Sequence, residues 1–209
     1  MAFTFDDGPD PDGTPAVLDV LREHAARATF FVLGARVVEH PDLVRRIDAE
    51  GHELGLHGHE HVTLPELGPL AQLRTLVAGR RALRDALGRA PRLFRAPYGL
   101  QTPVTVAFSR LLRMQPVMWS AHAAEWTEQP LAACRDMVEP GIRPGGIVLL
   151  HDGSAGRNRR PRRPVPELAA LLDDLLSLAA SRDLDVVPVG ELLAQGRPER
   201  RFWYRSWRV

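Results

Sequence analysis

The sequence predicts an α/β fold in which a largely parallel sheet closes, or nearly closes, on itself. Short apolar runs alternate with longer amphipathic stretches along the 209 residues, and this alternation repeats about seven times. An open, doubly wound sheet is the alternative architecture that the same alternation allows. No shift in composition and no long linker divides the chain, so we expect one domain over residues 1–209.

The expected strands are short and apolar, as strands buried in a parallel sheet are. They cover residues 2–5, 29–33, 52–56, 93–95, 117–120, 146–150 and 185–188. Between them, apolar residues recur three to four positions apart, which is the spacing of one helix face. This spacing predicts helices over residues 15–26, 43–49, 70–87 and 167–180.

Composition excludes several classes of protein. Hydrophobic residues make up 44% of the chain and charged residues 25%, which is ordinary for a globular protein. A formal net charge of +1 argues against general nucleic-acid binding. No apolar run reaches the ~18 residues that a membrane span needs. Cys134 is the only cysteine, so any metal must be held by histidine and carboxylate rather than by thiolates.

The N-terminal residues bear on localisation. The run MAFTFDD turns acidic at once and has neither a basic leader nor the apolar stretch of a secretory signal. We therefore expect a cytoplasmic protein rather than an exported one, unless a leader has been removed.

Five polar clusters follow predicted strands. They are DDGP at 6–9, HGHEH at 57–61, RAPYG at 95–99, HAAEW at 122–126 and HDG at 151–153. Each cluster lies just past the C-terminal end of a strand, and in parallel α/β barrels active sites are assembled at that rim. The sequence therefore predicts a site built from all five clusters.

The first two clusters carry residue types that bind cations. Adjacent residues of a strand point to opposite faces, so one of Asp6 and Asp7 can bind a cation while the other faces the reacting centre. The alternative is a simple turn, because DDGP is also good turn chemistry. His57 and His61 share a face if a helical turn begins there, whereas His57 and His59 share a face of a strand. Spacing favours a metal site but does not choose the pair.

The later clusters suggest proton transfer and orientation. Pro97 fixes one backbone angle and Gly99 releases another, which is a way to aim a backbone N–H or the Tyr98 ring. The alternative is an ordinary loop with Arg95 in a surface ion pair. His151 emerges from an apolar strand and could act as a general acid or base, or could simply cap the edge of the sheet.

Two segments are rich in arginine. The run at 157–163 is expected to be a solvated loop, with attraction of an anionic substrate as the alternative. The basic and aromatic tail at 197–209 is expected to pack on the barrel, with contact to a partner or stacking on sugar rings as alternatives.

Taken together and in order, the motifs resemble one family. The runs TFDDGP at 4–9, ATFFVLG at 28–34, GHELGLH at 51–57 followed by His61, RAPYG at 95–99 and LLHD at 149–152 are similar to the polysaccharide deacetylase family. That family shares the NodB homology domain and is placed in carbohydrate esterase family 4. The match extends from about residue 2 to about residue 195. It implies a distorted (β/α) barrel with fewer than eight repeats.

The resemblance also implies a metal site and catalytic roles. Asp7, His57 and His61 would hold one divalent ion, normally zinc, although cobalt or another divalent ion can serve. By the same resemblance, Asp6 would be the catalytic base and His151 the general acid. Arg95 would orient the base, and Tyr98 would donate a backbone N–H to the oxyanion. We expect the substrate-binding site to be lined by Pro97, Tyr98, His122, Trp126 and Leu149.

Two positions depart from the family pattern. Gly58 stands where the family usually has serine or threonine. His122 stands where we expect the aspartate that pairs with the acid His151, with Glu125 at the place of a second aspartate. Either Glu125 or Asp152 would compensate, or the leaving group differs. This departure predicts a narrower, divergent substrate range around an intact metal centre.

These observations predict a metal-dependent hydrolase acting on linear amides, which removes N-acetyl groups from an amino sugar such as an N-acetylglucosamine-containing glycan. One alternative is an intracellular deacylase of a small N-acylated sugar or biosynthetic intermediate. Another is a catalytically silent sugar-binding module, which the presence of every catalytic residue type disfavours.

Overall fold

The computed structural model describes residues 1–127, 129–154 and 164–196. Within them the chain forms one seven-stranded sheet in which every recorded pair of neighbouring strands is parallel. The strands are β1 (Ala2–Asp6), β2 (Thr29–Val32), β3 (Glu53–Leu56), β4 (Leu93–Phe94), β5 (Gln115–Pro116), β6 (Ala121–His122) and β7 (Ile147–His151). The arginine run at 157–163 and the tail at 197–209 lie outside the described residues.

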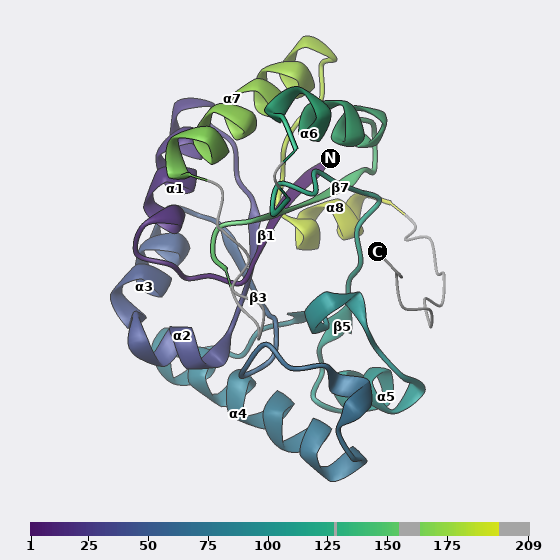
Figure 1. The fold of residues 1–209 in the computed structure, drawn as a ribbon. Coiled ribbons are helices and arrows are strands. Elements are labelled where there is room, and N and C mark those ends of the chain that lie inside the picture. The colour runs from purple at the N-terminus through teal and green to yellow at the C-terminus, as the bar shows by residue number, and fades with distance from the viewer. Residues whose placement is uncertain (128, 155–163, 197–209) are drawn as a thin grey trace.

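The order of the strands decides between the two predicted architectures. The order is β5-β4-β3-β2-β1-β7-β6. Except between β5 and β6, each strand is followed in the chain by its neighbour in the sheet, always in the same direction around it, as in a barrel. A doubly wound sheet would instead reverse direction at a switch point. Figure 1 shows the sheet curled, with helices around its outside. The predicted distorted barrel is therefore confirmed, with β5 and β6 as its two edges.

Eight α-helices occur in the described residues, and most of them cover the outer face of the sheet (Figure 1). They are α1 (Gly13–Glu23), α2 (Gly34–Glu39), α3 (Pro41–Ala49), α4 (Pro69–Leu87), α5 (Pro103–Leu111), α6 (Leu131–Val138), α7 (Val165–Ser181) and α8 (Val189–Gln195). Short 3₁₀ turns lie at η1 (Leu64–Glu66), η2 (Pro97–Gly99) and η3 (Glu139–Gly141). None of these helices is long and apolar enough to cross a membrane.

Local chemistry explains where the helices begin and end. Proline occupies the first position of α4, where its missing N–H costs no helical hydrogen bond, and Gly88 ends the helix in the left-handed conformation. Thr102 and Thr105 form a capping box at the start of α5. The predicted helix at 15–26 ends earlier than expected, because Ala25 has a positive φ of 49° and turns the chain.

The sheet separates two apolar layers. The larger layer includes Phe3 and Phe5 and lies between the sheet and its helices. The smaller layer includes Ala2, Phe31 and Val189 and lies on the opposite, inner face. Because side chains alternate along β1, Ala2, Thr4 and Asp6 share that inner face. The inner face is thus apolar near the start of β1 and polar at its end.

Helix α8 is fastened near the starts of β2 and β3. The backbone N–H of Val189 donates to Thr29 Oγ1 at 2.9 Å, and that of Gly190 donates to Glu53 Oε2 at 2.8 Å. Val189 packs in the inner apolar layer. These contacts place α8 at the N-terminal ends of the strands, so that the C-terminal ends are left for the polar clusters.

Two predicted strands are absent. Residues 117–120 cross from one sheet edge to the other: the Val117 N–H bonds to the Phe94 carbonyl, whereas the Ser120 N–H bonds to that of Ile147. Only the short β5 and β6 on either side of this segment pair as strands. Residues 185–188 are not a strand either, because their backbone bonds to the N-terminal segment involve only Met1, which precedes β1, and Pro188 has no N–H to extend a ladder.

Candidate active site

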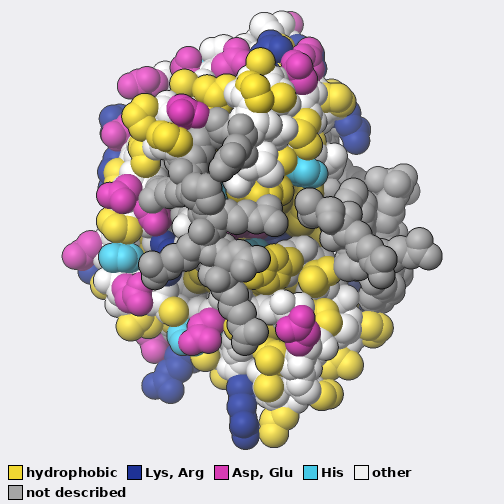
Figure 2. Space-filling view, viewed as in Figure 1, with side chains coloured by type: hydrophobic (Ala, Val, Ile, Leu, Met, Phe, Trp, Pro, Cys, Tyr) yellow, Lys and Arg dark blue, Asp and Glu magenta, His cyan; other side chains and the backbone are white. Residues whose placement is uncertain are grey.

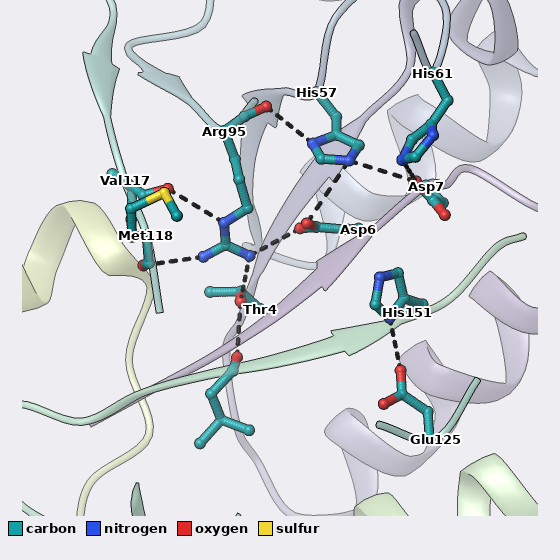
Figure 3. Close-up of polar contacts among 11 residues, drawn as sticks. Thr4, Asp6, Asp7, His57, His61, Arg95, Val117, Met118, Glu125 and His151 are labelled. Atoms are coloured by element: carbon teal, nitrogen blue, oxygen red, sulfur yellow. Dashed lines mark hydrogen bonds and ion pairs between the residues drawn. The ribbon is translucent and has the colours of Figure 1, made fainter. Parts of the chain in front are cut away.

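The C-terminal ends of the strands bring the polar clusters together. Figure 3 shows the side chains that converge there from β1, from the loops after β3, β4 and β6, and from β7: Asp6, Asp7, His57, His61, Arg95, Glu125 and His151. In Figure 2 most Asp, Glu, Lys and Arg side chains lie over the helices at the periphery, and apolar side chains are more frequent towards the middle of this view.

Asp7, His57 and His61 form a compact group that could hold a metal ion, with one ligand atom of each within 4.8 Å of the others. Asp7 Oδ1 lies 3.5 Å from His57 Nε2 and 3.3 Å from His61 Nε2. A tetrahedral ion with bonds of about 2.0–2.1 Å would hold its ligand atoms about 3.3–3.4 Å apart. The spacing of these donors therefore fits a small divalent ion.

The two histidines are held in the neutral form that binds metals. His57 Nδ1 donates to the carbonyl oxygen of Arg95 at 2.9 Å, which turns its Nε2 towards Asp7. Burial, and then the positive charge of Arg95, lower the pKa of His57 to about 3. Burial, and then His57, lower the pKa of His61 to about 3. Both imidazoles therefore offer a lone pair at neutral pH.

The loop after β3 explains why His59 is not part of this group. Gly58 has a positive φ of 93°, which turns the chain out of the strand. The carbonyl oxygens of Gly58 and His59 then accept hydrogen bonds from the first N–H groups of α2. The His59 ring packs against Gly34, so closely that a Cβ on Gly34 would lie 2.7 Å from His59 Nδ1. The geometry thus brings His57 together with His61 and leaves His59 aside.

Asp6 faces the barrel interior, where it pairs with Arg95. Arg95 Nη1 donates to Asp6 Oδ1 and to Thr4 Oγ1, each at 2.8 Å. The guanidinium also lies 4.1 Å from the centre of the Phe31 ring, and only 1% of Arg95 is exposed. The alternative of a surface ion pair for Arg95 is therefore wrong. Burial raises the pKa of Asp6, and the charge of Arg95 opposes that increase.

Asp6 and Asp7 diverge for a reason other than strand alternation. Asp6 is the last residue of β1 and lies opposite His151 of β7. Asp7 follows with a φ of 76°, in the left-handed region, so it belongs to a turn rather than to a continued strand. The turn directs Asp7 towards the histidines while Asp6 stays with Arg95 (Figure 3).

His151 is paired with Glu125. Its Nδ1 lies 2.7 Å from Glu125 Oε1, and Glu125 is 3% exposed. Burial alone would lower the pKa of His151, but the Glu125 charge and hydrogen bond overcome it and raise that pKa to about 9. The partner is thus Glu125 rather than the residue at position 122. Asp152 does not fill this role, because it bonds to Thr14 in a separate buried cluster.

The predicted substrate-lining residues fall into two groups around the rim. Tyr98 is 47% exposed, and its ring centre lies 4.2 Å from that of His61. Pro97 is buried beside it, near Gly58. On the other side, His122 pairs in register with Leu149, and its ring stacks on Trp126, which contacts His151. Glu125 and Asp152 were the two residues expected to compensate for His122, and Glu125, the first carboxylate after β6, is the one that contacts His151.

The chain is similar to known proteins of one family. The polysaccharide deacetylase family model matches residues 1–117. Chitooligosaccharide deacetylases of Bradyrhizobium sp. (strain ANU 289) and Sinorhizobium fredii (strain NBRC 101917 / NGR234) are 44% and 42% identical over 152 residues, which are 72% of this chain and 69% and 71% of theirs. The chain belongs to the polysaccharide deacetylase family, as its motifs predicted.

A longer relative covers more of the chain. The peptidoglycan-N-acetylglucosamine deacetylase PgdA of Listeria monocytogenes is 32% identical over 195 residues, which are 93% of this chain but 39% of PgdA. Among solved structures, the Bc1960 peptidoglycan N-acetylglucosamine deacetylase has a TM-score of 0.83 at 27% identity, over 95% of this chain and 89% of that one. The peptidoglycan deacetylase PdaC of Bacillus subtilis has a TM-score of 0.80 at 28% identity, over 92% and 89%.

Proposed function

We propose that the protein is a metal-dependent hydrolase that removes N-acetyl groups from N-acetylglucosamine units of a glycan or oligosaccharide. The observation that carries this proposal is the meeting of three groups at one rim: the Asp7–His57–His61 triad, which could hold a metal ion, the Asp6–Arg95 pair and the Glu125–His151 pair. The relatives named as chitooligosaccharide and peptidoglycan deacetylases support the choice of substrate.

A single zinc ion is the cofactor that we propose, with cobalt or another divalent ion as a substitute. Two neutral imidazoles and one carboxylate form a ligand set that suits zinc, and they leave at least one coordination position for water or substrate. When bound, such an ion supplies Lewis-acid polarisation of the amide carbonyl and lowers the pKa of water. The sole cysteine, Cys134, is buried in the apolar layer outside the sheet and offers no ligand here.

In the proposed reaction Asp6 serves as the general base. Its carboxylate lies 3.8 Å from His57 Nε2 and is therefore beside the metal group without belonging to it. Arg95 holds one carboxylate oxygen and opposes the effect of burial on the pKa, so that Asp6 can be ionised when it accepts a proton from the attacking water.

In the proposed reaction His151 serves as the general acid. Because Nδ1 is occupied by Glu125, Nε2 is the atom left to give a proton to the departing amine. The C–N bond breaks as water adds its hydroxyl to the acyl carbon and its proton is passed to nitrogen. The products are acetate and a free amino sugar, so protons and electrons balance without a further reactant.

Tyr98 is proposed to stabilise the developing oxyanion through its backbone N–H. Its positive φ of 57° turns the backbone at the rim, beside His61. A donor of this kind contributes about 3–4 kcal/mol to transition-state stabilisation. Pro97, Leu149, Trp126 and His122 would form the walls that hold the acetyl group and the sugar.

The test is release of acetate by the zinc-loaded protein. We expect release from chitooligosaccharides or peptidoglycan, together with new amino groups on the sugar. N-acetylglucosamine itself tests the alternative of a small sugar substrate. If none of these substrates released acetate, with or without zinc or cobalt, the proposal would be contradicted. The remaining alternative would then be a catalytically silent sugar-binding module.

A further inference from the structure

The loop that joins β6 to α6 has an unusual turn. Ala124 has a positive φ of 49°, and its carbonyl oxygen accepts three hydrogen bonds, from the Thr127 N–H, the Thr127 hydroxyl and Gln129 Nε2. A residue with a β-carbon is strained at positive φ, so these hydrogen bonds stabilise a backbone conformation that alanine by itself disfavours. The turn directs Glu125 into the protein and Trp126 towards His151.

His122 contacts the indole of Trp126. Their ring centres are 5.5 Å apart and the planes differ by 26°, which is a stacked arrangement. The Trp126 ring in turn meets that of His151 at 4.9 Å and 81°, an edge-to-face contact. Since His122 pairs with Leu149, two residues before His151, it lies one step deeper on the same inner face of the sheet.

Because Glu125 is the hydrogen-bond partner of His151, His122 must have a role other than that of this partner. Glu125 occupies His151 Nδ1, so His122 is not the residue that holds this proton. Burial, partly offset by Glu125, lowers the pKa of His122, so its ring is neutral at neutral pH. A neutral, flat ring against an indole acts through its shape and stacking rather than through charge.

On the basis of the proposed function, we infer that His122 is a positioning residue for the acid His151. Its ring braces Trp126 against the His151 imidazole, so that His151 is held from two sides, by Glu125 at Nδ1 and by Trp126 at the ring. The stacked pair also forms the wall on the leaving-amine side of the site. An aromatic ring at position 122, rather than an ionisable partner, is what this arrangement requires.

The test compares His122→Ala with His122→Phe, which keeps a flat ring but removes both nitrogens. We expect His122→Ala to lower kcat/KM about tenfold, equivalent to about 1.4 kcal/mol, through kcat more than KM. His122→Phe should retain activity within about threefold. The alkaline limb of the pH profile should stay in place in both variants, because Glu125 remains. His24→Ala, a surface histidine paired with Asp173, is the control and should match the wild type.

A second measurement does not depend on catalysis. Trp126→Phe identifies the contribution of Trp126 to the fluorescence, and acrylamide quenching then reports its accessibility. We expect quenching of Trp126 to increase in His122→Ala and to stay unchanged in His122→Phe. If the wild-type protein released no acetate, the proposed function would fail while this comparison still tested the role of His122.

Three results would overturn the inference. The first is equal loss of activity in the two variants, which would assign the role to the imidazole nitrogens. The second is a shift of the alkaline limb in His122→Phe, which would make His122 a proton partner. The third is unchanged activity and unchanged quenching in His122→Ala. His122→Gln, similar in length but without a ring, should behave as His122→Ala does and provides a second variant if that protein folds poorly.

Discussion

His151 Nδ1 lies 2.7 Å from a carboxylate oxygen of Glu125, which the chain presents from a loop on the neighbouring strand (Figure 3). This contact fixes which imidazole nitrogen faces the site, and it keeps a partly buried histidine protonated where burial alone would lower its pKa. The carboxylate comes from the residue directly before Trp126, so one short loop supplies both the charge and the ring that contact His151.

Glu125→Gln should move the alkaline limb of the pH profile. The proposed acid works only when protonated, so activity is lost as the pH rises through the pKa of His151, about 9 in this structure. Without the Glu125 charge, burial dominates and the pKa falls, so activity should be lost at a lower pH. The profile of kcat against pH measures this shift. Glu125→Asp, which keeps the charge, is the control, and an unmoved limb in Glu125→Gln would contradict the pairing.

His61→Ala should abolish tight metal binding, whereas His59→Ala should not. His61 Nε2 lies 3.3 Å from Asp7 Oδ1, but His59 packs against Gly34 outside the triad. We expect deacetylase activity to fall at least a hundredfold in His61→Ala, since loss of a ligand removes metal catalysis. Zinc titration monitored by calorimetry measures the affinity for zinc. A comparable loss of zinc binding in His59→Ala would show that the ligand set is wrong.

Asp6→Asn should lower kcat by about 10²–10⁴-fold, the usual contribution of a positioned general base. Zinc binding should remain, because Asp6 stands outside the triad. The variant leaves the Arg95 charge buried without its carboxylate, so thermal stability should fall as well. Steady-state kinetics and a melting curve measure the two effects. Unchanged kcat with full zinc occupancy would remove Asp6 from the reaction.

Gly153→Ala should disturb Asp7 through the backbone. A Cβ at Gly153 would lie 2.8 Å from the Asp7 carbonyl oxygen and 2.9 Å from its carbon, so the turn that carries Asp7, a proposed metal ligand, would have to shift. We expect a loss of about 1–3 kcal/mol of stability and zinc affinity reduced about 10–100-fold. Denaturant unfolding and zinc titration measure these effects. Gly196→Ala, where a Cβ meets nothing within 4 Å, is the matched control and should change neither.

Much of the fold follows from local patterns. The alternation of apolar runs with amphipathic stretches predicted β1, β2, β3, β4 and β7, together with α1, α3, α4 and α7. The short elements were harder to predict. Residues 117–120 have the apolar character of a strand, yet their backbone groups bond to two different edges of the sheet. These residues bond to two edges because the sheet is open between β5 and β6, and no local sequence pattern predicts that opening.

The sequence by itself determined that five residues would meet, because each lies at or just after the C-terminal end of a parallel strand and such ends share one rim. They are Asp6, Asp7, His57, Arg95 and His151. It left the choice between His59 and His61 to family resemblance, since spacing alone allows either. The tertiary structure decided that choice by docking the Gly58 turn on α2. It also decided the partner of His151. Glu125 reaches the His151 imidazole because its loop turns at Ala124, which has a positive φ, and such a turn leaves no periodic signal in the sequence.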